Sequence, residues 1–309
     1  MLEDLQATVA GLFGRREPRG TFWDLVTGLL MGLPTANCWT IAEAVGHRGP
    51  YRLQHLLSRA VWDAEAVLAG VASWTVEHLT GPAILAVDET GDAKSSADAV
   101  GAAQQYSGAL GGVGLCQVAV HLSVVTPAGH AVIGRHLYLG AGWACDDERR
   151  TLAGVPDDLA FATKPDLAIA LIRSAVAAGV RAQYVTADEV YSSVAFRTAC
   201  RALGLAYVVA VPAIRQVTTP DHRRRTCAGT LRLIPAAAWA RMRTGSATKG
   251  AKDYDWALLA IDDDDTPATD HETDASERGR PATARCWHAG TATPARSPTS
   301  GAGPQPPCH

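Results

Sequence analysis

The 309-residue chain lacks several features that would assign it to a membrane, a secretory pathway or a zinc-thiolate fold. It contains no run of about 18 apolar residues, so no transmembrane helix is expected. Its first ten residues include Glu3 and Asp4 and lack the pattern of a signal peptide. The seven cysteines are dispersed, with no CxxC motif and no Cys/His pair at zinc spacing. We therefore expect a soluble, cytoplasmic protein with reduced thiols and no membrane partner.

The chain also lacks a large overall charge, since the net charge is −3, but charge is distributed unevenly along it. Residues 201–252 contain ten Lys or Arg and one acid, whereas residues 253–277 contain ten acids and no Lys or Arg. A basic block of this kind is typical of a polyanion partner, DNA included. The candidate DNA contacts are Arg215, Arg223, Arg224, Arg225, Arg232, Arg241, Arg243, Lys249 and Lys252. For Arg223, Arg224 and Arg225, a position in a solvated loop without DNA contact is an interpretation of equal weight.

Acids follow two apolar runs that have the character of buried strands. The run AILAV over 83–87 leads into Asp88 and Glu89, and QYVTA over 183–187 leads into Asp188. An acid at the end of a buried strand is costly unless a partner neutralises it. The pattern indicates that Asp88 and Asp188 converge on a divalent metal, while capping of the following turn is the structural alternative.

The periodicity divides the chain into segments. Residues 1–80 read as a module of short helices separated by glycine turns, compatible with either DNA contact or a plain helical cap. From residue 83 the order is strand, β-hairpin, helix, strand, helix and strand, ending near residue 211. Residues 266–309 contain no Val, Ile, Leu, Met, Phe or Tyr and hold seven of the seventeen prolines. Such a tail is expected to be disordered.

Five motifs in this order resemble those of DDE-type insertion-sequence transposases. They are VDETG at 87–91, QQYSG at 104–108, LYLGAGW at 137–143, AGVPDDLAFATKPDLA at 153–168 and VTADEVY at 185–191. The likeness spans roughly residues 10–261. It implies an α/β fold, with a ribonuclease H-like mixed sheet and flanking helices, an α-helical N-terminal module before it and a disordered tail after it.

The resemblance also implies the chemistry. Asp88 and Asp188 would be catalytic carboxylates that hold Mg²⁺ (or Mn²⁺), and the substrate would be DNA at transposon ends and target sites. Lys164 and Tyr106 would lie near that site. The expected segments are a helical, potentially DNA-binding module over 1–80, a catalytic core over 81–212, a basic and β-rich insertion over 213–265, incomplete by comparison with the family, and the tail over 266–309. A homo-oligomer is left open.

The third carboxylate of the family is not found. The family carries a Glu on a helix after the insertion, and no segment of this sequence matches that context. We therefore expect a transposase that is defective through truncation or a shifted reading frame. Two alternatives remain open: an inactive remnant that still binds transposon ends, and a metal-dependent hydrolase of a small substrate. The sequence leaves the terminal repeat and the target site undetermined.

Overall fold

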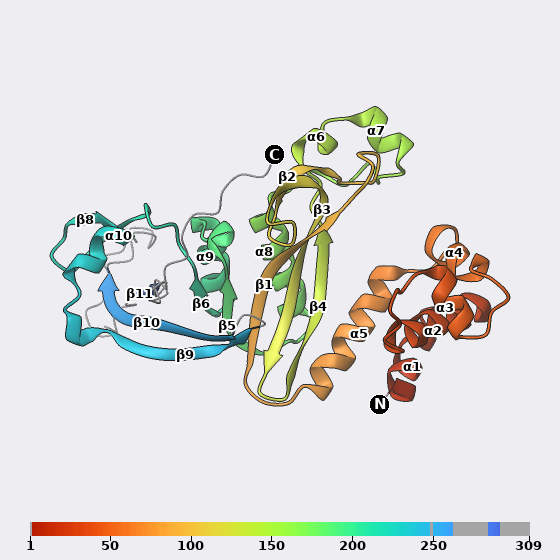
Figure 1. Cartoon of the computed structure of the whole chain (residues 1–309), viewed down its shortest axis with the longest axis horizontal. Helices are drawn as coiled ribbons and strands as arrows, with labels where there is room; N and C mark the ends of the chain where they lie inside the picture. Colours follow the sequence, from red (N-terminus) through yellow and green to blue (C-terminus); the bar gives the residue numbers. More distant parts are fainter. Residues whose placement is uncertain (1, 248–249, 262–283, 291–309) are drawn as a thin grey trace, which may run out of the picture. The chain divides into compact units, whose positions relative to one another are not determined.

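The computed structural model describes residues 2–247, 250–261 and 284–290 (Figure 1). The chain divides into two compact units, Met1–Ala210 and Val211–His309. No helix in the described part of the chain is long and apolar enough to cross a membrane.

Five helices open the first unit, and local capping explains where they begin. They are α1 (Leu2–Ala10), α2 (Arg16–Leu30), α3 (Cys38–Ala44), α4 (Tyr51–Ser58) and α5 (Ala64–His78). Asn37 caps α3 by accepting hydrogen bonds from two backbone N–H groups, and Thr40 completes a capping box. Asp63 caps α5 by accepting one hydrogen bond, from the backbone N–H of Ala66. Gly46, with φ of 80°, takes the chain out of α3.

Two small apolar clusters hold these helices together. Val9, Phe13 and Val67 form the first, with the Trp62 ring stacked on Phe13 at a centroid distance of 5.6 Å. Ile41, Ala42 and Leu53 form the second, which joins α3 to α4. The periodic apolar residues of the sequence thus become the contacts between helices.

A six-stranded mixed sheet follows, made of β1 (Ala83–Ala93), β2 (Ala103–Ser107), β3 (Gly112–Thr126), β4 (Gly129–Leu137), β5 (Ala182–Ala187) and β6 (Ala206–Val209). The order is β2-β3-β1-β5-β6, and β4 pairs with β3 as its hairpin partner. β1 and β3 are antiparallel, whereas β1–β5 and β5–β6 are parallel. This arrangement confirms the predicted ribonuclease H-like fold.

The connecting helices are α6 (Ala141–Ala144), α7 (Asp147–Leu152), α8 (Lys164–Ala177), the 3₁₀ turn η1 (Glu189–Tyr191) and α9 (Val194–Ala202). Thr163 and Asp166 form a capping box at the start of α8, where Pro165 occupies the first turn. Alternation along β1 buries Leu85 and Val87 in the main apolar core, which also contains Ile172 of α8 and Phe196 of α9. The helices therefore cover the face of β1 that carries the odd-numbered residues.

Three features of this unit differ from the sequence-based expectations. Asp88 does not end its strand, because pairing of β1 with β3 continues to Ala93. β2, α6 and α7 are absent from the order of strands and helices predicted from the sequence. In each case the element has a pairing or packing partner elsewhere in the chain.

The second unit is rich in short strands. It contains β7 (Gln216–Thr218), β8 (Arg224–Thr226), α10 (Cys227–Thr230), η2 (Leu231–Leu233), η3 (Ala236–Ala238), β9 (Ala240–Ala247), β10 (Gly250–Ile261) and β11 (Ala284–Gly290). β9, β10 and β11 form an antiparallel sheet with β10 in the centre. The predicted tail over 266–309 lies outside the described residues except for β11, a strand that the composition did not predict.

Gly91 provides a test of the packing between β1 and β2. An alanine Cβ at this position would lie 2.6 Å from the Cβ of Ser107. We expect Gly91→Ala to lower the free energy of unfolding by about 1–3 kcal/mol through overpacking. In the background of Ser107→Gly the nearest remaining atom is a Cα at 3.5 Å, so the same change should cost much less there. Equal costs in both backgrounds, measured by denaturant unfolding, would contradict this packing.

Candidate active site

The register of β1 and β5 brings Asp88 and Asp188 to the same level of the sheet. Ala86 pairs with Thr186 in this parallel pair of strands, and each aspartate lies two residues further along its chain. Asp188 directly follows β5, whereas Asp88 lies within β1 at the point where the pairing with β5 has ended. The two acids therefore occupy the carboxyl end of the β1–β5 pair.

Both carboxylates are exposed and already accept one backbone hydrogen bond. Asp88 Oδ1 accepts from the N–H of Glu89 at 2.8 Å. Asp188 Oδ1 accepts from the N–H of Val190 at 2.9 Å and so caps η1. Among the described residues, neither aspartate forms an ion pair with Lys, Arg or His. Each side chain therefore presents its second oxygen and an uncompensated negative charge.

The electrostatic potential at Asp188 is negative, because three other acids contribute to it. Partial burial raises the pKa of its carboxyl, and repulsion from Glu89, Asp88 and Glu189 raises it further. The hydrogen bond from Val190 opposes this shift. A carboxylate in such a position is stabilised by a cation.

Glu89 has the opposite character, although it is adjacent to Asp88 in sequence. It lies on the other face of β1, and its side chain is 18% exposed. Lys164, at the start of α8, donates to Glu89 Oε1 at 2.7 Å, and the Tyr191 hydroxyl donates to Oε2 at 3.4 Å. Burial and the nearby Glu89 raise the pKa of Tyr191, so its hydroxyl keeps its proton. The charge of Glu89 is thus compensated within the fold.

A histidine that the sequence did not indicate stands beside Asp88. His121 on β3 is the direct cross-strand neighbour of Asp88, and Arg135 on β4 is the neighbour of His121. His121 Nε2 lies 2.8 Å from the hydroxyl oxygen of Thr90. Burial and Arg135 lower the pKa of His121, while Asp88 opposes this shift. Only the strand register, which the sequence does not state, identifies this neighbour.

The predicted DNA-contacting residues lie in the second unit, and their charges differ in availability. Arg225 forms a two-point ion pair with Asp221, at 2.7 Å for each contact, and Arg243 pairs with Asp253. Both pairs raise the pKa of the arginine and lower that of its acid. Arg224, Arg232 and Arg241 are exposed and form no ion pair among the described residues. Arg223 is also exposed and lies 3.9 Å from Asp221, while Arg215 is half-buried. Lys249 and the side chain of Lys252 lie outside the described residues.

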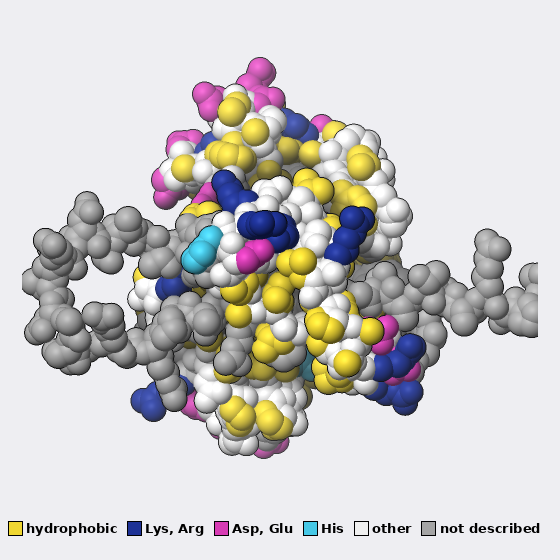
Figure 2. All heavy atoms as spheres, turned by 90° about the vertical axis from the view of Figure 1, so that its left-hand side faces the viewer, with side chains coloured by type: hydrophobic (Ala, Val, Ile, Leu, Met, Phe, Trp, Pro, Cys, Tyr) yellow, Lys and Arg dark blue, Asp and Glu magenta, His cyan; other side chains and the backbone are white. Residues whose placement is uncertain are grey.

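On the face of the molecule shown in Figure 2, the coloured atoms do not form a continuous basic surface. Lys and Arg side chains appear there as separate groups, with acidic, hydrophobic and uncharged atoms between them. Asp221 and Asp253 neutralise two of the arginines that the sequence counts as basic residues.

The sheet order and the flanking helices define a ribonuclease H-like domain. A family model described as DDE superfamily endonuclease matches residues 8–255, and the chain belongs to this family. A Microchaete diplosiphon protein named “Probable transposase for insertion sequence element IS701” is 29% identical over 195 residues, which are 60% of this chain and 47% of that protein. The chain thus matches about half the length of this relative. The predicted family is confirmed.

Substitution of Lys164 tests whether its ammonium group neutralises the charge of Glu89. We expect Lys164→Met to lower the free energy of unfolding by an amount between the ~1 kcal/mol of an exposed pair and the ~3–5 kcal/mol of a buried one. The double variant Glu89→Gln/Lys164→Met should recover most of this loss, because no unpaired charge remains. Lys94→Met, which breaks the exposed pair with Asp92, is the matched control. If denaturant unfolding gave the same small loss for both lysines, the pair would not be structural.

Asp188 gives a pH-dependent prediction. Its pKa is raised in the folded protein, so the ionised carboxylate opposes folding above that pKa and has no effect below the ordinary value near 3.8. Asp188→Asn keeps an acceptor for the N–H of Val190 and removes the charge. We expect the variant to melt above the wild type at pH 7, by a free energy under ~1 kcal/mol because the site is exposed. The difference should vanish near pH 3 in thermal melts, and a variant less stable at pH 7 would contradict the assignment.

Proposed function

We propose that this chain cleaves and joins DNA strands at transposon ends in a reaction that depends on a divalent metal. The observation that carries the proposal is the pair Asp88 and Asp188. They are exposed, lie at the same level of adjacent strands and have no cationic partner among the described residues. Glu89, equally close in sequence, is neutralised by Lys164 and is therefore excluded from the metal-binding role.

The donor set fits Mg²⁺ or Mn²⁺. Mg²⁺ prefers oxygen ligands and is commonly held by one or two carboxylates together with water and substrate phosphates. Asp88 and Asp188 would hold the ion through the oxygens that do not accept from the backbone. When bound, the metal supplies the charge that activates a water or a 3′-hydroxyl and stabilises the leaving oxygen of an in-line displacement. Lys164 and Glu89 fix β1 against α8 and so keep Asp88 in position.

DNA is the proposed partner of both units. In the core, Asp88 and Asp188 would repel the phosphates of DNA. The substrate would therefore contact the bound metal and not the carboxylates themselves. The basic residues of 213–265 would contact the phosphate backbone. Arg224, Arg232 and Arg241, which form no ion pair among the described residues, would contribute more than Arg225 and Arg243. The segment 1–80 would be the DNA-binding module.

A second candidate function is binding of transposon ends without cleavage. Within the residues that the structure describes, no group of three or more His, Cys, Asp or Glu side chains could hold a metal ion together. Two carboxylates alone would bind the metal more weakly than three. Because misplacement of a reacting group by about 1 Å costs on the order of a hundredfold in rate, weak or absent cleavage is the expected result of this arrangement.

The experiment uses the 309-residue chain and a plasmid that carries the DNA flanking its gene, incubated with Mg²⁺, Mn²⁺ or EDTA. We expect slow nicking with Mn²⁺ or Mg²⁺, none with EDTA, and a further loss to background in Asp88→Asn and Asp188→Asn. Glu189→Gln is the matched control, because it removes an exposed neighbouring charge. Cleavage in EDTA, or unchanged cleavage by both Asn variants, would overturn the proposal. Binding of the flanking DNA without any cleavage would support the second candidate.

A further inference from the structure

We propose that Tyr191 and Glu89 are positioning residues that set the separation of Asp88 and Asp188. Each belongs to the segment that carries one of the aspartates, and the two side chains meet behind the exposed acids. The inference rests on the proposed function, because it concerns the divalent metal that Asp88 and Asp188 would hold. It gives Tyr191 a role in metal binding without contact with the metal.

The backbone pairing of β1 with β5 sets the level of the aspartates but ends before it reaches them. The last paired residues, Ala86 and Thr186, each precede an aspartate by two positions. Beyond this point β1 continues beside β3, whereas the chain after Asp188 leaves the sheet and turns into η1. Among the described residues, no backbone hydrogen bond joins η1 to β1, so side chains hold this turn beside the strand.

Tyr191 anchors η1 in the core. It is 0% exposed, and the centroid of its ring lies 6.0 Å from that of Phe196 on α9. A hydroxyl buried in this way requires a hydrogen-bond partner. Glu89 supplies it, because its Oε2 accepts from the Tyr191 hydroxyl in a long hydrogen bond of 3.4 Å. The end of η1 is therefore tied to β1 through one side chain from each.

Glu89 joins three elements through a single carboxylate. It lies on β1, its Oε1 accepts from Lys164 of α8 at 2.7 Å, and its Oε2 accepts from Tyr191 of η1. The side chains of Lys164 and Glu89 are only 19% and 18% exposed. Because both oxygens of the carboxylate have a partner, the side chain has little freedom to rotate. A movement of η1 away from β1 would break the contact with Tyr191.

Asp188 moves together with η1. Its Oδ1 accepts from the N–H of Val190 at 2.9 Å, and its carbonyl oxygen accepts from the N–H of Tyr191 at 3.3 Å. The carboxylate of Asp188 and the ring of Tyr191 thus belong to one short turn. Mg²⁺ requires ligand distances close to ~2.0–2.1 Å, so a displacement of this turn weakens a site shared with Asp88.

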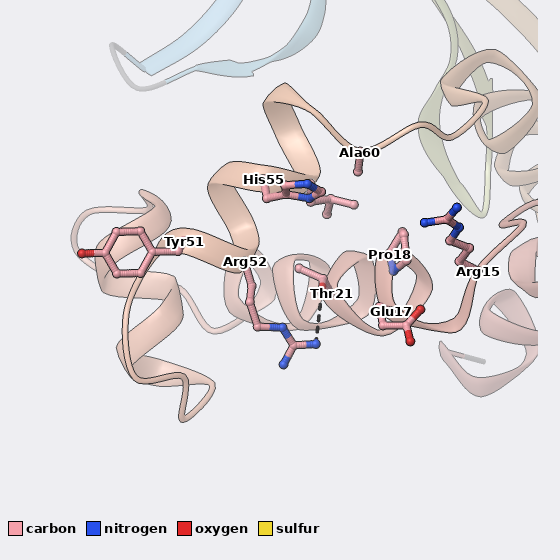
Figure 3. Close-up of a pocket in the computed structure, with 9 residues that line it drawn as sticks. Arg15, Glu17, Pro18, Thr21, Tyr51, Arg52, His55 and Ala60 are labelled. Atoms are coloured by element: carbon pink, nitrogen blue, oxygen red, sulfur yellow. Dashed lines mark hydrogen bonds between the residues drawn. The ribbon is translucent and has the colours of Figure 1, made fainter.

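Thr21 provides a matched control in the helical module, because it takes part in a hydrogen bond of similar length. The residue is 4% exposed, and its hydroxyl accepts from Arg52 Nη2 at 3.3 Å. This bond lies at a groove of about 400 Å³ between α2 and α4 (Figure 3). Thr21→Val and Tyr191→Phe each remove one buried hydroxyl that has a long hydrogen bond. Of the two residues, only Tyr191 belongs to a turn that carries an aspartate.

The first measurement is amide hydrogen exchange of the full chain in EDTA, followed by mass spectrometry in peptides that cover residues 186–193. We expect Tyr191→Phe to raise the exchange rate of these amides about two- to tenfold, as the loss of one hydrogen bond implies. Thr21→Val should leave the rate unchanged. An unchanged rate in Tyr191→Phe would overturn the proposal, whether or not the protein binds metal.

The second measurement is the affinity for Mn²⁺ without DNA, read from the electron paramagnetic resonance signal of the free ion. We expect Tyr191→Phe to raise the dissociation constant about three- to tenfold, at a temperature where thermal melts show every variant to be folded. Thr21→Val should bind Mn²⁺ like the wild type. In the background Glu89→Leu/Lys164→Met, which lacks the acceptor, Tyr191→Phe should cause no further loss.

These outcomes separate the inference from the proposed function. Wild-type Mn²⁺ affinity in Tyr191→Phe, or a loss that adds fully to that of Glu89→Leu/Lys164→Met, would overturn the positioning role. A general loss of stability would instead weaken Mn²⁺ binding in Thr21→Val as well. If Asp88→Asn binds Mn²⁺ as tightly as the wild type, the proposed metal site fails, and the exchange rates alone decide whether Tyr191 holds the turn.

Discussion

Asp88 and Asp188 repel one another, and the backbone pairing of β1 with β5 holds them at the same level of the sheet despite that repulsion. The apolar core beneath the sheet, with Leu85 and Val185 fully buried, stabilises this pairing. A sheet can impose such an unfavourable pair because moving either acid would break the strand register and expose the core. The site is therefore maintained by residues that do not take part in its chemistry.

Lys164 divides the acids of the site into two kinds. Its ammonium group neutralises Glu89 on the helix-covered face of β1, and no such cation is available to Asp88 or Asp188 among the described residues. A fold that compensated all of its acids would have little attraction for a divalent cation. The selective placement of one lysine leaves the exposed Asp88 and Asp188 with negative charge that no described cation compensates.

Local signals in the sequence predicted most elements of the core, because apolar runs and Gly or Pro punctuation determine where strands and helices begin. They failed where the end of an element depends on a distant partner: β1 continues past Asp88 because β3 pairs with it to Ala93. For the candidate site, the motifs indicated Asp88 and Asp188. They did not indicate that Lys164 pairs with Glu89, 75 residues away in the sequence, nor that His121 lies beside Asp88. Counting charges likewise could not reveal that Asp221 neutralises Arg225, or that Arg48, Arg52 and Arg59 form no ion pair among the described residues.

The alternation of β1 has a consequence for how this site tolerates change. Asp88 and Glu89 carry the same charge and differ by one methylene, so only the parity of their positions decides which of them faces solvent and which meets Lys164. Insertion or deletion of one residue between Ala83 and Val87, at the start of the strand, would move Asp88 to the helix-covered face and Glu89 to the exposed face. The composition of the site would not change. Length, and not side-chain identity, is thus the property of this segment that mutation is least free to alter.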